Sequence, residues 1–282
     1  MERAIIYGAG ATGMSVYEQI KKKGLSCLAF IDNDVSLQGK TINGIPIISP
    51  EDIVNFDYDK IYIGTIMDIE LLKLKLISMG VNETQIDDSL VSLSYKARIA
   101  FLKSQAEIFK DRGLVGSCAE CGVLSGSFAK VINETFPNQS LYLFDTFEGF
   151  DQRDIGVELT NGFSSSLAGT FGGLTSLESV MKSMPIPNKI IIKKGYFPET
   201  IEGIEDTFLF VNLDFDLYKP TLAGLEFFYQ NLVNGGIVLV HDYFSTRFKG
   251  VKQAVDEFCD KNSIFPIAIG DNSSVAIIKG IH

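Results

Sequence analysis

Short apolar runs alternate with helical patterns along the first 90 residues of the chain. Apolar runs of this length predict buried strands, and apolar residues at helical spacing follow them. The predicted strands cover residues 4–7, 27–31 and 60–64, and the helices 11–23 and 68–79. Strands that alternate with helices are typical of a doubly wound parallel sheet. Between these elements, Asn43-Gly44-Ile45-Pro46 predicts a turn.

The second half of the chain repeats this alternation on a larger scale. Its predicted strands cover residues 115–120, 141–145, 190–193, 208–213, 236–240, 265–269 and 275–278. A helix is predicted over 221–233, with Pro220 in its first turn. The last two strands leave little room for a crossover, so we expect them to form an antiparallel pair.

The expected fold is therefore α/β, with two doubly wound domains. A small Rossmann-like domain is predicted over residues 1–92, and a linker helix over 93–112 that ends at Gly113. A larger domain with a mostly parallel seven-stranded sheet is predicted over 113–282.

Composition narrows the possible chemistry. The chain has 282 residues, of which 46% are hydrophobic and 21% charged, as in ordinary globular proteins. Its net charge of −10 is divided evenly between residues 1–92 and the rest, and this acidity disfavours nucleic-acid binding. With 2 His and 4 Cys, a His-rich metal site and a disulfide scaffold are not expected. Without a signal peptide or membrane span, we expect a cytoplasmic protein with reduced thiols.

The first glycine-rich motif follows the first predicted strand. Gly8, Gly10 and Gly13 match G-x-G-x-x-G before a helix, and Asp32 ends the second strand. Such glycines let backbone amides approach a pyrophosphate, and the acid can bind a ribose hydroxyl. The motif predicts a nucleotide or NAD-like ligand in this small domain. The alternative is a Rossmann-like turn that binds nothing tightly.

A second glycine turn opens the larger domain. Glu120 stands at the end of its first strand, Gly122 and Gly126 follow, and Asp145 ends the next strand. An acid and glycines at this place suit a ligand with an amino acid part and a nucleoside, and Asp145 can accept both hydroxyls of a ribose. The alternative is that these acids cap helices or are solvated.

Two further pairs of polar residues follow apolar strands. Asp214 and Asp216 come after one strand, and His241 and Asp242 after another. The carboxyl ends of strands are where open α/β sheets bind ligands, so Asp214, Asp242 and His241 can converge on a hard cation such as Mg²⁺. A clustered carboxylate can also act as a general base. Helix capping would explain one pair more easily than both.

Two other segments have competing interpretations. The glycine-rich stretch Gly156–Gly173 predicts a loop that could serve as a lid, or else a disordered insertion. Cys118 and Cys121 form a lone C-x-x-C within a predicted buried strand, and we interpret them as packing residues.

The first domain resembles the small N-terminal domains of sugar-modifying proteins such as sugar-nucleotide acetyltransferases. The similar segments are Ile6–Gly10, Phe30–Asp34 and Asn43–Pro46. In those proteins the domain often binds a nucleotide sugar, which the resemblance implies here.

The second domain resembles the macrocin O-methyltransferase (TylF-type) family of S-adenosylmethionine-dependent sugar O-methyltransferases. The ordered matching blocks are Glu120–Val123, Asp145–Gly149, Gly195–Thr200, Leu213–Tyr218, Gly235–Val238, His241–Tyr243 and Gly250–Phe258. The resemblance implies a class I methyltransferase fold, with Asp216 as general base on the sugar hydroxyl and Mg²⁺ bound by Asp214 and Asp242. The implied cofactor-binding residues are Glu120, Gly122, Gly126, Asp145 and Thr146.

The chain departs from the family pattern at three places. His241 stands where a first acid is usual, and an imidazole is a softer ligand than a carboxylate. Phe215 replaces a residue that is commonly small, and Lys219-Pro220-Thr221 replaces an acidic, Ser/Thr-rich run at the expected acceptor pocket.

We therefore expect an S-adenosylmethionine-dependent, Mg²⁺-dependent O-methyltransferase. It would act on a sugar hydroxyl of a nucleotide sugar, a glycan or a glycosylated natural product, with no nucleic-acid partner, and form a homo-oligomer. One alternative is a methyltransferase-like binding protein of a polysaccharide pathway whose site has decayed, which His241 motivates. Another is an NAD-dependent sugar-modifying enzyme, against which the lack of a Tyr-x-x-x-Lys dyad argues.

Overall fold

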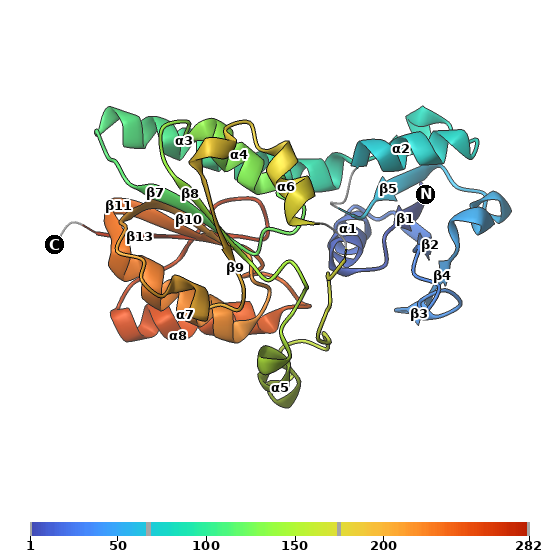
Figure 1. Cartoon of the computed structure of the whole chain (residues 1–282). Coiled ribbons are helices and arrows are strands. Elements are labelled where there is room, and N and C mark those ends of the chain that lie inside the picture. Colours follow the sequence, from blue (N-terminus) through green and yellow to red (C-terminus); the bar gives the residue numbers. More distant parts are fainter. Residues whose placement is uncertain (1, 66–68, 174–175, 281–282) are drawn as a thin grey trace. The chain divides into compact units, whose positions relative to one another are not determined.

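The chain folds into two compact units. The computed structural model describes residues 2–65, 69–173 and 176–280. The division falls between Lys96 and Ala97, and each unit contains its own sheet (Figure 1). No helix within the described residues is both long and apolar enough to cross a membrane.

The first unit is built on a six-stranded sheet in the order β3-β4-β2-β1-β5-β6. Its strands are β1 (Arg3–Tyr7), β2 (Ser26–Ile31), β3 (Thr41–Ile42), β4 (Ile45–Ile48), β5 (Lys60–Ile63) and β6 (Ile86–Asp87). Its helices are α1 (Ala11–Lys22) and α2 (Ile69–Ser78). All neighbouring pairs are parallel except β3–β4. The predicted beginning of the second helix at Asp68 lies outside the described residues.

Successive residues of β1 point into two different hydrophobic cores. Ala4 and Ile6 belong to the core with Val16 and Ile20 of α1, whereas Ile5 belongs to the core on the other face. This alternation is the period of two that a strand covered on both faces requires. It explains why β1 reads as a continuous apolar run.

The turn predicted at Asn43 and Gly44 joins β3 to β4. Both residues have positive φ, 52° and 79°. Two-residue hairpin loops need this left-handed geometry, which Asn and Gly adopt at low cost. The turn therefore belongs to a short antiparallel hairpin at the edge of the sheet.

The second unit contains a seven-stranded sheet in the order β12-β13-β11-β10-β7-β8-β9. The strands are β7 (Ser117–Cys121), β8 (Leu141–Asp145), β9 (Ile190–Lys194), β10 (Phe208–Leu213), β11 (Leu232–Val240), β12 (Ile267–Ala268) and β13 (Val275–Ile278). The pairs formed by β13 with β11 and β12 are antiparallel, and the other pairs are parallel. This confirms the predicted mostly parallel, seven-stranded α/β fold.

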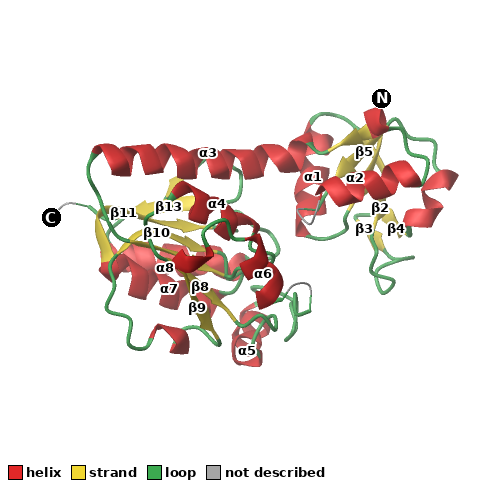
Figure 2. Ribbon diagram, turned by 45° about the horizontal axis from the view of Figure 1, so that its top comes forward, coloured by secondary structure: helices red, strands yellow, loops and turns green. Residues whose placement is uncertain are grey.

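Helices cover both faces of this sheet. After α3 (Ser89–Asp111), the helices of this unit are α4 (Ser127–Thr135), α5 (Gln152–Asn161), α6 (Leu177–Ser183), α7 (Tyr218–Asn231) and α8 (Lys249–Asn262). In Figures 1 and 2, α4 lies on one face and α7 and α8 on the other. The predicted loop over 156–173 begins as helix, because Asp151 caps α5 through the Arg153 amide.

The long helix α3 runs from Ser89 to Asp111 and is continuous in Figure 2. The segment predicted as a linker, residues 93–112, lies almost wholly within it. Its Leu102 and Phe109 are buried, and the Phe109 ring lies 6.3 Å from that of Phe136. The later part of α3 is therefore an apolar face packed in the second unit.

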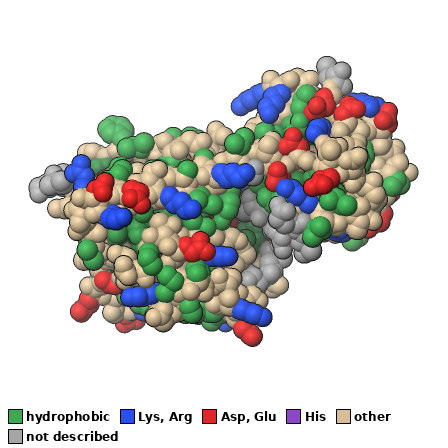
Figure 3. All heavy atoms as spheres, turned by 90° about the horizontal axis from the view of Figure 1, so that it is seen from above, with side chains coloured by type: hydrophobic (Ala, Val, Ile, Leu, Met, Phe, Trp, Pro, Cys, Tyr) green, Lys and Arg blue, Asp and Glu red, His purple; other side chains and the backbone are tan. Residues whose placement is uncertain are grey.

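Charged side chains are mixed on the surface. On the face drawn in Figure 3, acidic and basic side chains of the described residues are interspersed, without an extended patch of either sign. The net charge of −10, which belongs to the whole chain, therefore does not form a charged patch on this face.

Candidate active site

The order of the second sheet brings the polar ends of two strands together. β7 lies between β8, which is the next strand in sequence, and β10. The order in which strands are added to the sheet therefore reverses between β7 and β10. Ligands of open α/β sheets bind outside the carboxyl ends of strands at such a point. Leu213 of β10 pairs with Val240 of β11, and the His241 amide donates to the Leu213 carbonyl at 2.9 Å. Asp214 and His241 are thus neighbours.

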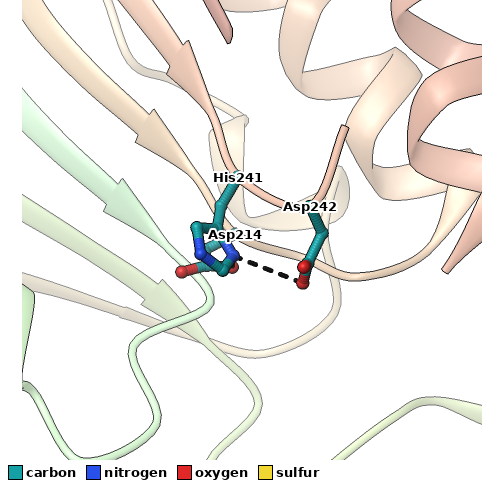
Figure 4. A group of neighbouring side chains, drawn as sticks. All are labelled: Asp214, His241 and Asp242. Atoms are coloured by element: carbon teal, nitrogen blue, oxygen red, sulfur yellow. Dashed lines mark ion pairs between the residues drawn. The ribbon is translucent and has the colours of Figure 1, made fainter. Parts of the chain in front are cut away.

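Asp214, His241 and Asp242 form one cluster at this edge (Figure 4). His241 Nδ1 lies 3.0 Å from an Asp214 oxygen and 3.3 Å from an Asp242 oxygen. Within the described residues this buried Nδ1 has no partner in hydrogen-bond geometry. One ligand atom from each side chain lies within 4.8 Å of the others. An orphaned nitrogen facing two carboxylates fits a divalent cation.

The charges in this cluster stabilise one another. Burial pushes the pKa of Asp214 upward, but the charges of His241 and Arg98 outweigh burial and lower that pKa. Burial likewise disfavours a charged His241, but the two aspartates raise its pKa to about 10. Without a cation the imidazole is therefore protonated at neutral pH. A metal must displace that proton to bind Nδ1.

Asp216 lies beside this cluster in a left-handed backbone conformation. Its φ is 63°, and that of Asp242 is 60°, in a region that Asp enters more readily than most other residues with a side chain. Burial and the neighbouring Asp242 raise the pKa of Asp216 well above its usual range, and the two carboxyls share a hydrogen bond. A raised pKa makes the Asp216 carboxylate a stronger base.

Neither pair of strand-end acids caps a helix. The N-cap residues of α7 and α8 are Leu217 and Phe248, and neither helix has a side-chain cap. The capping interpretation of Asp214, Asp216 and Asp242 therefore does not explain their placement.

Arg98 of α3 reaches this cluster from a distant part of the sequence. Its Nη2 donates to Asp214 at 3.0 Å and to the Asn212 side-chain oxygen at 2.8 Å, and the residue is 6% exposed. Its guanidinium also lies over the Phe128 ring, 4.1 Å from the centroid. No local motif marks Arg98, because its contact with Asp214 joins residues 116 positions apart.

Two more polar groups are buried next to Asp214. Glu120 is the next-to-last residue of β7, and Asn212 lies in β10, directly opposite it in the sheet. Glu120 Oε2 and Asn212 Nδ2 are buried without a hydrogen-bond partner among the described residues. Burial raises the pKa of Glu120 well above its usual range. Unsatisfied buried groups at a ligand-binding edge fit a polar, cationic ligand, since a nearby positive charge favours the carboxylate.

The glycines of the second motif are required by packing within the chain. At Gly122, φ is 80° and a Cβ atom would lie 2.1 Å from the Asp214 carbonyl oxygen. Gly126 has φ of 74°, and its Cβ would meet Val180 and Met184 of the α6 region. Gly122 therefore allows the turn after β7 to approach the end of β10.

Asp145 and Thr146 form hydrogen bonds with the loops that follow β7 and β8. One Asp145 oxygen accepts from the Val123 and Leu124 amides at 2.6 and 3.2 Å, and the other from Phe147 at 2.7 Å. The Thr146 hydroxyl donates to the Gly149 carbonyl at 2.7 Å. Asp145 thus positions the glycine turn, and the oxygen bonded only to Phe147 keeps a lone pair for a ligand.

The first glycine motif lies wholly in the other unit. A Cβ at Gly13 would lie 1.9 Å from the Gly8 oxygen, and one at Gly8 would lie 2.4 Å from the Gly64 oxygen. Asp32 accepts from the Ala9 and Asp34 amides, both at 2.9 Å. Gly10 is the N-cap of α1 and provides no side-chain cap, so amides of the first turn remain available.

Other features that the sequence analysis described also lie in the second unit. Cys118 and Cys121 are free and completely buried, as expected for packing residues. Phe215 packs against Phe197, with ring centroids 4.7 Å apart. A cavity of about 410 Å³ is lined by Asn161, Phe163, Tyr218 and Gln253. Tyr218 follows Asp216 by two residues.

Comparison with known proteins gives independent information. The family model for macrocin-O-methyltransferase (TylF) matches residues 88–277, and one for C2185-like, N-terminal matches residues 1–87. The O-methyltransferase NovP is similar in structure, with a TM-score of 0.52 and 22% identity over 66% of this chain and 80% of that one. The calicheamicin methyltransferase CalS11 has a TM-score of 0.54 and 19% identity, over 77% and 88%. No curated protein sequence matches the chain.

Proposed function

The chain belongs to the macrocin O-methyltransferase (TylF) family, and from this premise we propose that it methylates a sugar hydroxyl with the aid of a divalent cation. The observation that carries the proposal is the cluster of Asp214, His241 and Asp242 beside Asp216, at the carboxyl edge of a methyltransferase sheet. The acceptor would be a nucleotide sugar, a glycan or a glycosylated natural product.

We propose that the cofactor lies against the ends of β7 and β8. S-adenosylmethionine supplies an electrophilic methyl group on a sulfonium. Glu120 would face its cationic methionine part, and the free lone pair of Asp145 would accept from a ribose hydroxyl. Gly122, Gly126 and Thr146 would shape the turns that enclose it. Placing the acceptor oxygen against the methyl group provides much of the acceleration.

Asp216 is proposed to remove the proton of the attacking hydroxyl. Its raised pKa suits a general base, and its carboxyl shares a hydrogen bond with that of Asp242. Asp214, His241 and Asp242 would bind the cation, Mg²⁺ or a similar ion, which lowers the pKa of a coordinated hydroxyl. Arg98 would hold Asp214 in place.

Methyl transfer to a panel of nucleotide sugars and glycans, with Mg²⁺ or with chelator, tests this proposal. We expect transfer to at least one acceptor with Mg²⁺ and its loss with chelator. Activity that survives chelation would remove the role of the metal. S-adenosylmethionine binding without transfer to any acceptor would instead favour a decayed site.

The first unit is proposed to bind a nucleotide or NAD-like ligand through Gly8, Gly10, Gly13 and Asp32. The uncapped first turn of α1 supports this, although the close packing of Gly8 and Gly13 gives these glycines a structural role as well. Calorimetric titration with UDP and with NAD⁺ tests it, and Asp32→Ala should abolish the binding of whichever ligand is taken up. Failure of both ligands to bind would leave the glycines with packing alone.

A further inference from the structure

Among the described residues, Arg247 is a largely covered cation whose guanidinium has no hydrogen-bond or ion-pair partner. Its side chain is half-buried, yet no hydrogen bond or ion pair within the described residues involves its guanidinium. The other covered arginines differ: Arg3 pairs with Asp57 and Asp59, and Arg98 with Asp214. Covering a charge without a partner is unfavourable, so this arrangement requires an explanation.

Aromatic side chains hold Arg247 in place. Its guanidinium carbon lies 4.8 Å from the ring centroid of Phe248 and 5.6 Å from that of Phe171. Both rings pack edge to face on Phe150. These contacts orient the planar guanidinium and leave its N–H donors unused.

Arg247 belongs to the segment that connects the end of β11 with the beginning of α8. His241 and Asp242 open the same segment, so Arg247 lies on the carboxyl side of the sheet. β11 pairs with β10, whose end leads to Asp216. The segment that contains Arg247 and the segment that contains the proposed base therefore leave the sheet at neighbouring strand ends.

The helix that follows adds to the positive potential. α8 begins at Lys249, and its first turn contains no acidic residue. The next basic residue of α8, Lys252, is paired with Asp256. The N-terminal end of a helix already carries partial positive charge, and acids usually occur there. Arg247, Lys249 and the N-terminal end of α8 thus place positive charge close together along this segment.

We propose that Arg247 binds an oxyanion of the acceptor, so that the sugar methylated by this chain carries a phosphate or a carboxylate. This inference rests on the proposed function, because it places the acceptor at Asp216. A guanidinium binds either group through two parallel hydrogen bonds, and its rigid fork favours such planar recognition. A nucleotide sugar or sugar phosphate would supply the phosphate, and a uronic acid the carboxylate.

Binding of two anionic probes to the whole chain tests the proposal. Pyrophosphate and glucuronate are titrated by calorimetry into protein saturated with S-adenosylhomocysteine, in chelator so that binding does not run through a metal. We expect at least one probe to bind, and Arg247→Gln to weaken it by about tenfold or more. The probe that responds identifies the source of the oxyanion.

The control variant is Arg112→Gln, which removes an exposed arginine of the same unit. It should bind the probe as the wild type does. Arg247→Lys keeps the charge without the fork and should retain part of the affinity, which also serves if the Gln variant does not fold. Failure of both probes to bind at millimolar concentration, or equal binding by wild type and Arg247→Gln, overturns the proposal.

S-adenosylmethionine binding, measured on the same proteins without S-adenosylhomocysteine, distinguishes failure of the proposed function from failure of the role of Arg247. If the cofactor does not bind, the proposed function itself fails. If it binds and an anionic sugar is methylated equally by wild type and Arg247→Gln, only the role of Arg247 fails.

Discussion

Asp214 and Asp216 are two residues apart, yet the pKa values of their carboxyls are shifted in opposite directions. His241 and Arg98 lower the pKa of Asp214 against the effect of burial, whereas burial and Asp242 raise that of Asp216. Carboxyls whose environments separate their pKa values in this way can divide ligand and base roles between them.

Asp216→Asn should abolish most turnover while leaving the cofactor site intact. Asn accepts the left-handed backbone, but it cannot take a proton, so we expect a loss of about 10²–10⁴ in kcat. Calorimetry should give an S-adenosylmethionine affinity equal to that of the wild type. Full activity in this variant would exclude Asp216 as the base.

Arg98→Met should destabilise the second unit. It would leave the Asp214 carboxylate with His241 but without the buried guanidinium, at a cost of about 3 kcal/mol in the free energy of unfolding. Denaturant unfolding measures the change. The control is Arg153→Met, which removes an arginine from exposed ion pairs with Asp151 and Glu199 and should change stability little. Equal behaviour of the two variants would contradict the role of Arg98.

At the scale of elements, α5 is attached through a buried carboxyl. Glu158 is 1% exposed, and its Oε1 accepts from the Tyr218 amide at the beginning of α7 at 2.8 Å. Burial raises the pKa of Glu158. The folded chain therefore keeps this proton at pH values where the unfolded chain has lost it, and stability falls as the pH rises through that window.

Glu158→Gln should remove this pH dependence. Its amide oxygen can still accept from Tyr218, so we expect the variant to gain stability relative to the wild type as the pH rises above about 4.5. Thermal unfolding at pH 4 and pH 8 measures the difference. Glu202→Gln, at an exposed position, should show no such trend. A constant offset at both pH values would argue against the buried proton.

Two glycines of the second unit should respond oppositely to alanine. Gly122→Ala places a Cβ against the Asp214 carbonyl at positive φ, and we expect a loss of at least about 3 kcal/mol. Gly156 lies within α5 with nothing near its Cβ position, so Gly156→Ala should gain about 0.5–1 kcal/mol. Chemical denaturation compares the two. A mild effect at Gly122 would show that the β7 turn can move away from β10.

Elements were predictable where their own sequence carries the signal. β1, β8 and β10 are apolar runs buried on both faces, and their bounds follow the predictions within one residue. The short edge strands β3 and β6 contain two residues each, too few to show a period. Helix α5 was not predicted, and its second half was assigned to the loop over 156–173, because its polar sequence includes Gly156. The Asp151 cap is a local signal that could have indicated the helix.

Residues of the candidate site were predictable where they directly follow an apolar strand. Strand ends are visible in sequence, so Asp214, His241 and Asp242 could be placed at one edge. Arg98 and Asn212 were not found, since their meeting depends on how α3 packs on the sheet. Long-range contacts of this kind leave no local periodicity.

At the scale of the whole molecule, two glycine-rich turns in separate units could each bind a nucleoside. S-adenosylhomocysteine should slow amide hydrogen exchange at the ends of β7, β8 and β10 and leave β1 and β2 unchanged. A ligand at about 100 times its dissociation constant adds about 2.7 kcal/mol of stability, enough for clear protection. Protection at the turn after β1 instead would place the cofactor in the first unit.

The left-handed backbone at Asp216 and Asp242 also limits how the site can change over evolution. Only Gly, Asn and Asp adopt this conformation at low cost, so few replacements at either position leave the loop undisturbed. A descendant that loses methyl transfer should therefore drift first to Asn or Gly at these positions, and only later to larger residues. The residue found at these two positions in a relative would then indicate whether it lost its chemistry recently or long ago.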